Sequence, residues 1–169
     1  MSKRDEERLA AAGGTAPVVQ IAAMVVGAVF LVFGVAGFIP GITSDFDELS
    51  WAGHHSGALL LGVFAVSILH NLVHLAFGVA GLVFARSAAT AKAYLLWGGA
   101  VYAVLWLYGL AIDHHGPLNF VPVNTADNWL HLGLAVTMIA SGVLLGRLAD
   151  TARSILIQDV PNGSIVHAI

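Results

Sequence analysis

Residues 93–112 read AYLLWGGAVYAVLWLYGLAI, an apolar stretch without a charged side chain. Lys92 precedes this stretch and Asp113 follows it. An α-helix of about 20 predominantly apolar residues spans the hydrocarbon core of a bilayer. The stretch therefore predicts a membrane-spanning helix, and its length and lack of charge provide the criteria for finding others.

The remainder of the chain contains further apolar stretches of this kind. They cover about residues 17–39, 57–85 and 128–146. Pro17 suits the first position of a helix, because an N–H donor is not needed there. Pro40-Gly41 marks the end of the first stretch. The sequence thus predicts an all-α integral membrane protein whose fold is a bundle of four transmembrane helices.

The composition supports the same fold class. Hydrophobic residues make up 58% of the 169 residues and charged residues only 10%, whereas soluble domains contain about 25% charged residues. We therefore exclude a soluble protein and expect the lipid bilayer as the main partner. The expected division is a cytoplasmic N-terminal segment 1–16, a membrane domain 17–147 and a cytoplasmic tail 148–169.

Two further classes are excluded by the charge and by the absence of cysteine. The net charge of −3 comes without a basic stripe, so the chain offers no phosphate-binding surface and we expect no nucleic acid partner. No cysteine is present, which excludes disulfides and thiolate metal sites. Any metal chemistry would fall to histidines and carboxylates.

The basic residues indicate the orientation of the bundle. All seven fall in segments on one side of the predicted helices: Lys3, Arg4, Arg8, Arg86, Lys92, Arg147 and Arg153. The opposite loops contain carboxylates and neither lysine nor arginine. Loops rich in lysine and arginine stay in the cytoplasm. We therefore expect a multi-pass plasma-membrane protein with both termini in the cytoplasm.

A short motif occurs twice. Asn71-x-x-His74-Leu75 and Asn128-x-x-His131-Leu132 lie in predicted helices that run in the same direction. This pattern raises the alternative that the bundle consists of two repeated helical hairpins, related by an axis along the membrane normal. With a rise of about 1.5 Å per residue, His70 matches the predicted depth of His131 better than His74 does. The alternative of an unrepeated bundle stays open.

Polar residues within the predicted helices are the candidates for a functional site. His70 and His74 are four residues apart and share one face of a helix. Ionisable side chains inside a membrane are costly and point to function. The candidate cofactor-binding residues are His70, Asn71, His74, Asn128 and His131.

Three interpretations of these residues stay open. We favour an accessory or structural protein, in which neutral histidines and asparagines form hydrogen bonds between helices. The alternative is a redox protein that binds a metal, a haem or a quinone through His70, His74 and His131. His70 and His74 could not both bind one haem, whereas His70 and His131 could bind its opposite faces. The third interpretation is a small ion or proton carrier. The identity of a cofactor, a homo-oligomer and membership of a larger membrane complex also stay open.

The sequence provides no set of catalytic residues. His70-Asn71-Leu72-Val73-His74 resembles the zincin motif His-Glu-x-x-His, but Asn71 replaces the glutamate that serves as general base. An amide cannot accept a proton from a metal-bound water in this way. We therefore favour a non-enzymatic protein.

Longer motifs carry a family resemblance. His70-Asn71-x-x-His74 is followed by Gly78, and Pro122-Val123-Asn124 leads into Ala126-Asp127-Asn128-Trp129-Leu130-His131-Leu132. With these motifs the chain resembles, over about residues 16–147, a bacterial and mainly actinobacterial membrane family, domain of unknown function 4383. The resemblance implies four helices in a bacterial plasma membrane. It implies no activity and assigns no role to the histidines.

Overall fold

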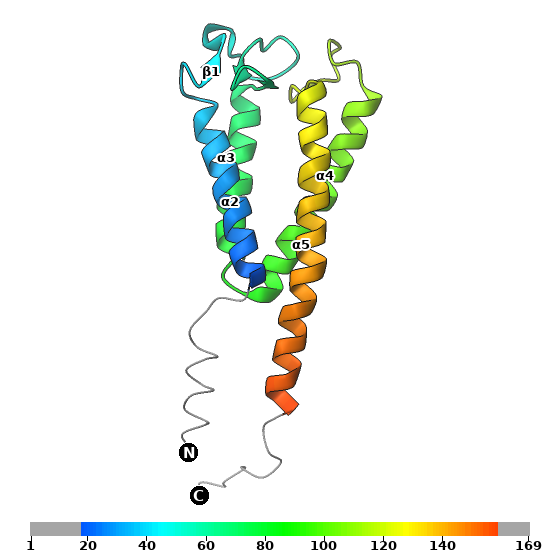
Figure 1. Ribbon diagram of the computed structural model, residues 1–169. Coiled ribbons are helices and arrows are strands. Elements are labelled where there is room, and N and C mark those ends of the chain that lie inside the picture. Colours follow the sequence, from blue (N-terminus) through cyan, green and yellow to red (C-terminus); the bar gives the residue numbers. More distant parts are fainter. Residues whose placement is uncertain (1–17, 159–169) are drawn as a thin grey trace, which may run out of the picture.

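The structure is a computed structural model that describes residues 18–158. Within this range the chain forms four helices, α2 (Val18–Ala36), α3 (Ile68–Phe84), α4 (Ala88–Ala111) and α5 (Thr125–Gln158). α2 packs on α3 and α4 on α5, so the helices form two antiparallel hairpins (Figure 1). The expectations for residues 1–16, for a helix start at Pro17 and for residues 159–169 lie outside the described residues.

Three of the helices are long and apolar enough to cross a membrane. They are α2, α4 and the Thr125–Thr151 part of α5. α3 is apolar but has only 17 residues. At about 1.5 Å per residue its length is about 26 Å, which is shorter than the roughly 30 Å of a bilayer core. The described helices are those of an all-α membrane protein with three candidate spans and a shorter apolar helix.

The predicted span 57–85 is wrong in its first part, which is not helical. β2 (Leu59–Leu60) and β3 (Phe64–Ala65) join β1 (Thr43–Ser44) in a small antiparallel sheet of order β1-β2-β3, beside the 3-10 helix η1 (Phe46–Glu48). Leu61 and Gly62 have positive φ angles of 56° and 70°, which a right-handed helix cannot contain. Helix α3 begins only after Ser67, whose side chain accepts the backbone N–H of His70. A short apolar run does not distinguish a strand from a helix.

The last predicted span, 128–146, lies inside a longer helix. α5 has 34 residues, about 51 Å at the usual rise, so the first part of the predicted tail 148–169 continues the helix. No proline or glycine interrupts the sequence between Gly146 and Pro161. Lys92 on α4 pairs with Asp150 on this extension, with 2.6 Å between Nζ and Oδ2.

The two ends of the bundle differ. The α3–α4 turn lies at one end, and the α2–α3 and α4–α5 connections lie at the other, where the hairpins diverge (Figure 1). Arg86 lies in that turn and Lys92 near the start of α4, so we name this end the basic end. The opposite end, which includes the sheet and residues 112–124, is the loop end.

The same close contact occurs once in each hairpin. A Cβ atom on Gly27 would lie 2.9 Å from the carbonyl oxygen of Gly78, and one on Gly99 would lie 3.1 Å from that of Ala135. Only glycine allows these helix backbones to approach so closely. The contact defines a repeat register: α4 follows α2 by 72 residues (Gly27 to Gly99), and α5 follows α3 by 57 residues (Gly78 to Ala135).

The buried positions agree with this repeat register. In α2 the buried Val19, Ala23, Gly27 and Phe30 correspond to the buried Ala91, Leu95, Gly99 and Tyr102 of α4. In α3 the buried His70, Asn71, Gly78 and Gly81 correspond to the buried Asp127, Asn128, Ala135 and Met138 of α5. In this register His131 corresponds to His74, and not to His70 as the depth estimate indicated. That estimate measured depth from Arg147, although α5 continues beyond this residue without a break.

Candidate functional site

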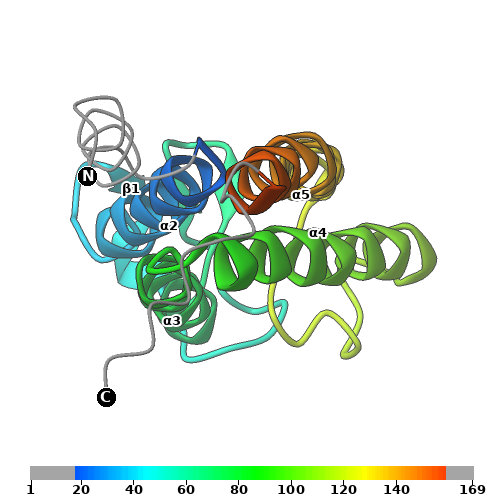
Figure 2. The ribbon, with the colours of Figure 1, turned by 90° about the horizontal axis from the view of Figure 1, so that it is seen from below.

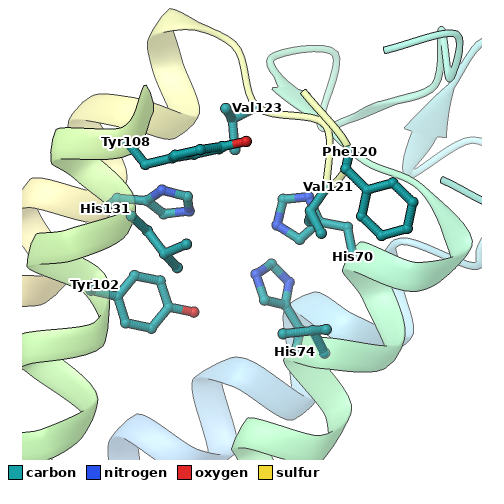
Figure 3. Close-up of a pocket in the computed structure, with 10 residues that line it drawn as sticks. His70, His74, Tyr102, Tyr108, Phe120, Val121, Val123 and His131 are labelled. Carbon is teal, nitrogen blue, oxygen red and sulfur yellow. The ribbon is translucent and has the colours of Figure 1, made fainter. Parts of the chain in front are cut away.

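Three of the predicted site residues line one cavity. The cavity has a volume of about 240 Å³ and lies between α3, α4, α5 and the loop that precedes α5. Its lining consists of His70, Val73, His74, Tyr102, Leu105, Tyr108, Phe120, Val121, Val123 and His131. His131, Tyr102 and Tyr108 face His70 and His74 across this space (Figure 3). We name it the histidine cavity.

His70 connects the two hairpins. It lies in the first turn of α3, is 4% exposed, and its Nδ1 lies 3.1 Å from the carbonyl oxygen of Pro122. Because a carbonyl oxygen can only accept, Nδ1 carries the proton, and Nε2 of the neutral ring is an acceptor. His70 therefore anchors α3 to the loop before α5 and retains one nitrogen for a further hydrogen bond.

His74 and His131 retain hydrogen-bonding capacity that the protein does not use. The His74 ring lies 4.5 Å from the His70 ring, between ring centroids, and the His131 ring lies 5.2 Å from that of Tyr102. Within residues 18–158, Nδ1 of His74 and Nδ1 of His131 are buried without a hydrogen-bond partner. His131 is only 5% exposed. A buried polar group without a partner costs about 1–3 kcal/mol, so a partner from outside the chain would stabilise these side chains.

Tyr102 is a site residue that the sequence reasoning missed. It is buried, and its ring stacks on Phe30 at 5.4 Å between centroids. Its hydroxyl points into the histidine cavity (Figure 3). Tyr108 is used differently, since its hydroxyl donates to the carbonyl oxygen of Leu118 at 2.5 Å. The repeat register could have indicated Tyr102. It aligns this tyrosine with Phe30 of α2, so that a hydroxyl is present in one hairpin and absent from the other.

Asn71 and Asn128 do not line the histidine cavity. Asn71 packs on Gly37, and Asn128 packs on Gly109 at the equivalent place in the other hairpin. Both amide side chains are buried, and their Oδ1 atoms have no hydrogen-bond partner within the described part of the chain. The five predicted residues therefore divide into three histidines at one cavity and two asparagines, one in the helix packing of each hairpin.

Reciprocal hydrogen bonds join the two hairpins at the loop end. Asp127 Oδ2 accepts the backbone N–H of Ala65 and that of Asn124, both at 2.9 Å. In the repeat register, Asp127 corresponds to His70 and Ala65 corresponds to Pro122. Each hairpin thus uses the start of its second helix to hold the loop of the other hairpin. These bonds fix the wall of the histidine cavity at the loop end.

The metal and haem alternatives do not fit this geometry. Among residues 18–158, no group of three or more His, Asp or Glu side chains is placed to hold a metal ion. His70, His74 and His131 are therefore not arranged as a three-ligand metal site in this structure. A cavity of about 240 Å³ is smaller than the roughly 300–1,000 Å³ that drug-sized ligands occupy, so a haem is too large.

Two apolar helical hairpins with a shared buried cavity define the class of this protein, a multi-pass membrane protein. Residues 20–144 match the family described as Domain of unknown function (DUF4383), and the chain belongs to that family. The match includes both hairpins and every residue that lines the histidine cavity. No curated protein and no solved structure matches the chain.

Proposed function

We propose that this protein is an accessory protein of the bacterial plasma membrane that binds a small uncharged molecule in the histidine cavity. The observation that carries the proposal is His131, which is 5% exposed, lacks a partner at Nδ1 and lies against Tyr102. A few polar groups in an otherwise apolar cavity are typical of ligand sites. Here the polar groups are these two side chains, His74 and the free nitrogen of His70.

The absence of charge in the lining favours an uncharged ligand. The residues around the histidine cavity include no lysine, arginine, aspartate or glutamate. A buried charge without a counter-charge is expensive. The described basic residues Arg86, Lys92 and Arg147 belong to the opposite half of the helices.

A purely structural role is the second candidate function. The hydrogen bonds of His70 to Pro122 and of Asp127 to Ala65 support it, because they hold the hairpins together without a ligand. In that case, replacing His131 or Tyr102 would change the stability of the protein and nothing else. Ligand content therefore distinguishes the two functions.

The test compares the small molecules that stay bound to the wild-type protein and to its variants after purification from the native membrane. We expect native mass spectrometry of the purified wild-type protein to show an additional small mass, which Tyr102→Phe and His131→Phe reduce or remove. Trp129→Phe is the control, because this side chain is 63% exposed and lies outside the cavity. Equal small-molecule content in all four proteins would leave the structural role as the function.

We also propose that the basic end faces the cytoplasm, and that both termini are cytoplasmic. The lysine and arginine residues of the described chain support this orientation. Because the chain contains no cysteine, single cysteines can report it. Asp47→Cys and Leu118→Cys, at exposed positions, should react with an impermeant maleimide in intact cells, and Ser87→Cys only after permeabilisation. The reverse pattern would contradict this orientation.

A further inference from the structure

A second cavity lies closer to the basic end than the histidine cavity. It has a volume of about 300 Å³ and lies between α3 and α4, where Phe77, Ala80, Ala93, Trp97 and Val101 line it. α3 and α4 lie close together near the turn that joins them, and α4 then extends away from α3 (Figure 2). We name this space the apolar cavity.

The apolar cavity offers no free hydroxyl group. Its hydroxyl groups belong to Thr90 and Tyr94. The Thr90 hydroxyl donates to the carbonyl oxygen of Phe84 at 2.6 Å, and the Tyr94 hydroxyl donates to that of Phe77 at 3.1 Å. The two cavities therefore differ in chemistry, since the histidine cavity has ring nitrogens without a partner and the hydroxyls of the apolar cavity are already bonded.

The two cavities lie one helix turn apart on the same pair of helices. On α3, Val73 lines the histidine cavity and Phe77 lines the apolar cavity. On α4, Leu105 lines the histidine cavity and Val101 lines the apolar cavity. One turn is about 5.4 Å. Val73, Val101 and Leu105 are 43%, 48% and 37% exposed, so the seam between α3 and α4 opens to the surface that faces lipid.

The lining of the histidine cavity suits a flat ring with oxygen substituents. The rings of Tyr102, Tyr108, Phe120 and the histidines surround it, and aromatic rings favour stacked or edge contacts with another ring. The Tyr102 hydroxyl can donate to a carbonyl oxygen, and the free nitrogen of His70 can accept from a hydroxyl. Quinone and quinol rings provide these two groups without a charge, whereas a phospholipid headgroup brings a charge that the cavity does not compensate.

Building on the proposed function, we infer that the ligand is a lipid-soluble quinone. Its ring lies in the histidine cavity between His70 and His131. Its apolar chain runs along the α3–α4 seam into the apolar cavity, past Phe77 and Val101. A polar ring at one end and an apolar chain at the other match the order of the two cavities along the helices.

The experiment uses the full-length protein in detergent and two probes, a decyl-substituted benzoquinone and the same ring with a methyl group. Saturable quenching of tryptophan fluorescence by the quinone ring measures binding of both probes. Ala93→Phe fills the apolar cavity. We expect it to weaken binding of the decyl quinone about tenfold and that of the methyl quinone less than about twofold. Tyr102→Phe should weaken both about tenfold, because it removes the hydrogen bond to the ring.

Controls keep the outcomes distinct. Leu110→Phe adds the same ring on α4 outside both cavities and should leave both affinities unchanged. Ala80→Phe fills the apolar cavity from α3 and replaces Ala93→Phe if that variant does not fold.

Two results would overturn the inference. If the cavity-filling variants leave decyl quinone binding intact while Tyr102→Phe weakens it, the chain does not lie in the seam, and the proposed function stands. If the folded wild-type protein binds neither quinone, the ligand class is wrong. Mass spectrometry of the protein from its native membrane then decides the proposed function separately.

Discussion

The repeat register places a counterpart of the histidine cavity between α2 and α5, and the two differ sharply in size. The α2–α5 cavity has a volume of about 40 Å³, against about 240 Å³ for the histidine cavity. Its lining is Val29, Phe30, Phe33, His74, Leu130 and Leu134. His74 in this lining is the equivalent of His131, and His74 lines both cavities.

A few side chains account for the difference. Phe33 and Leu130 in the α2–α5 cavity stand where the histidine cavity has the smaller Leu105 and Val73. Phe30 stands where the histidine cavity has Tyr102. Filling a cavity with apolar groups stabilises a fold. The histidine cavity is instead left open and carries a hydroxyl, which is the pattern expected where a ligand binds.

The largest expected effect tests whether the hairpins are equivalent at all. Gly27→Leu and Gly99→Leu place a side chain where even a Cβ atom would meet a carbonyl oxygen of the paired helix. Each should destabilise the protein by about 3 kcal/mol or more, measured as loss of the folded protein on thermal unfolding in detergent. Gly133→Leu is the control, because a Cβ there meets nothing within 4 Å. Unequal losses from the two hairpins would contradict the repeat.

Removing the reciprocal hydrogen bonds between the hairpins should have the second-largest effect on stability. Asp127→Ala removes an acceptor from two backbone N–H groups, whereas His70→Ala removes one bond to Pro122. We expect a loss of about 2 kcal/mol for the first and about 1 kcal/mol for the second in the free energy of unfolding. Asp127→Asn retains an oxygen acceptor and should recover part of the loss. If Asp127→Ala proved neutral, these bonds would not hold the hairpins together.

The comparison also shows how much of the fold the sequence predicts. The apolar stretches and the basic residues at one end follow from hydropathy and charge. The sheet was missed, because residues 57–67 are as apolar as the helix that follows and only the backbone angles of Leu61 and Gly62 separate them. The end of α5 was placed too early, because a change in polarity does not end a helix that contains no glycine or proline.

The candidate site was predicted in part for a similar reason. His70 and His74 are one turn apart and were expected on one face, and the structure places both at one cavity. Asn71 was included because it is polar and adjacent, but consecutive residues of a helix point about 100° apart, so it faces Gly37 instead. Tyr102 was missed, since nothing in one helix shows which tyrosine a distant histidine will contact. Its role becomes visible only when the register pairs it with Phe30.

Matched variants in the two cavities should have a smaller effect, which is measured on quinone binding. Tyr102→Phe makes them alike at this position, and it should weaken binding of the methyl quinone about tenfold, or about 1.4 kcal/mol. Phe30→Tyr is the matched change in the α2–α5 cavity and should add no second binding site, because about 40 Å³ cannot hold the ring. Isothermal titration calorimetry measures both the affinity and the number of sites. Two sites in Phe30→Tyr would show that the hydroxyl, and not the volume, distinguishes the cavities.

The smallest expected effect lies at the basic end, where equivalent positions use different chemistry. Gln20 Nε2 donates to the carbonyl oxygen of Ala85 at 2.8 Å, whereas its equivalent Lys92 pairs with Asp150. The Asp150 side chain is 68% exposed, and exposed ion pairs contribute little because water and salt screen them. Asp150→Asn should therefore cost less than about 0.5 kcal/mol, and Gln20→Ala about 1 kcal/mol because it leaves a carbonyl without its partner. Thermal unfolding at low and high salt distinguishes the two variants, since the stability lost in Asp150→Asn should depend on salt and that lost in Gln20→Ala should not. A larger loss from Asp150→Asn would mean that the extension of α5 is held more firmly than its exposure indicates.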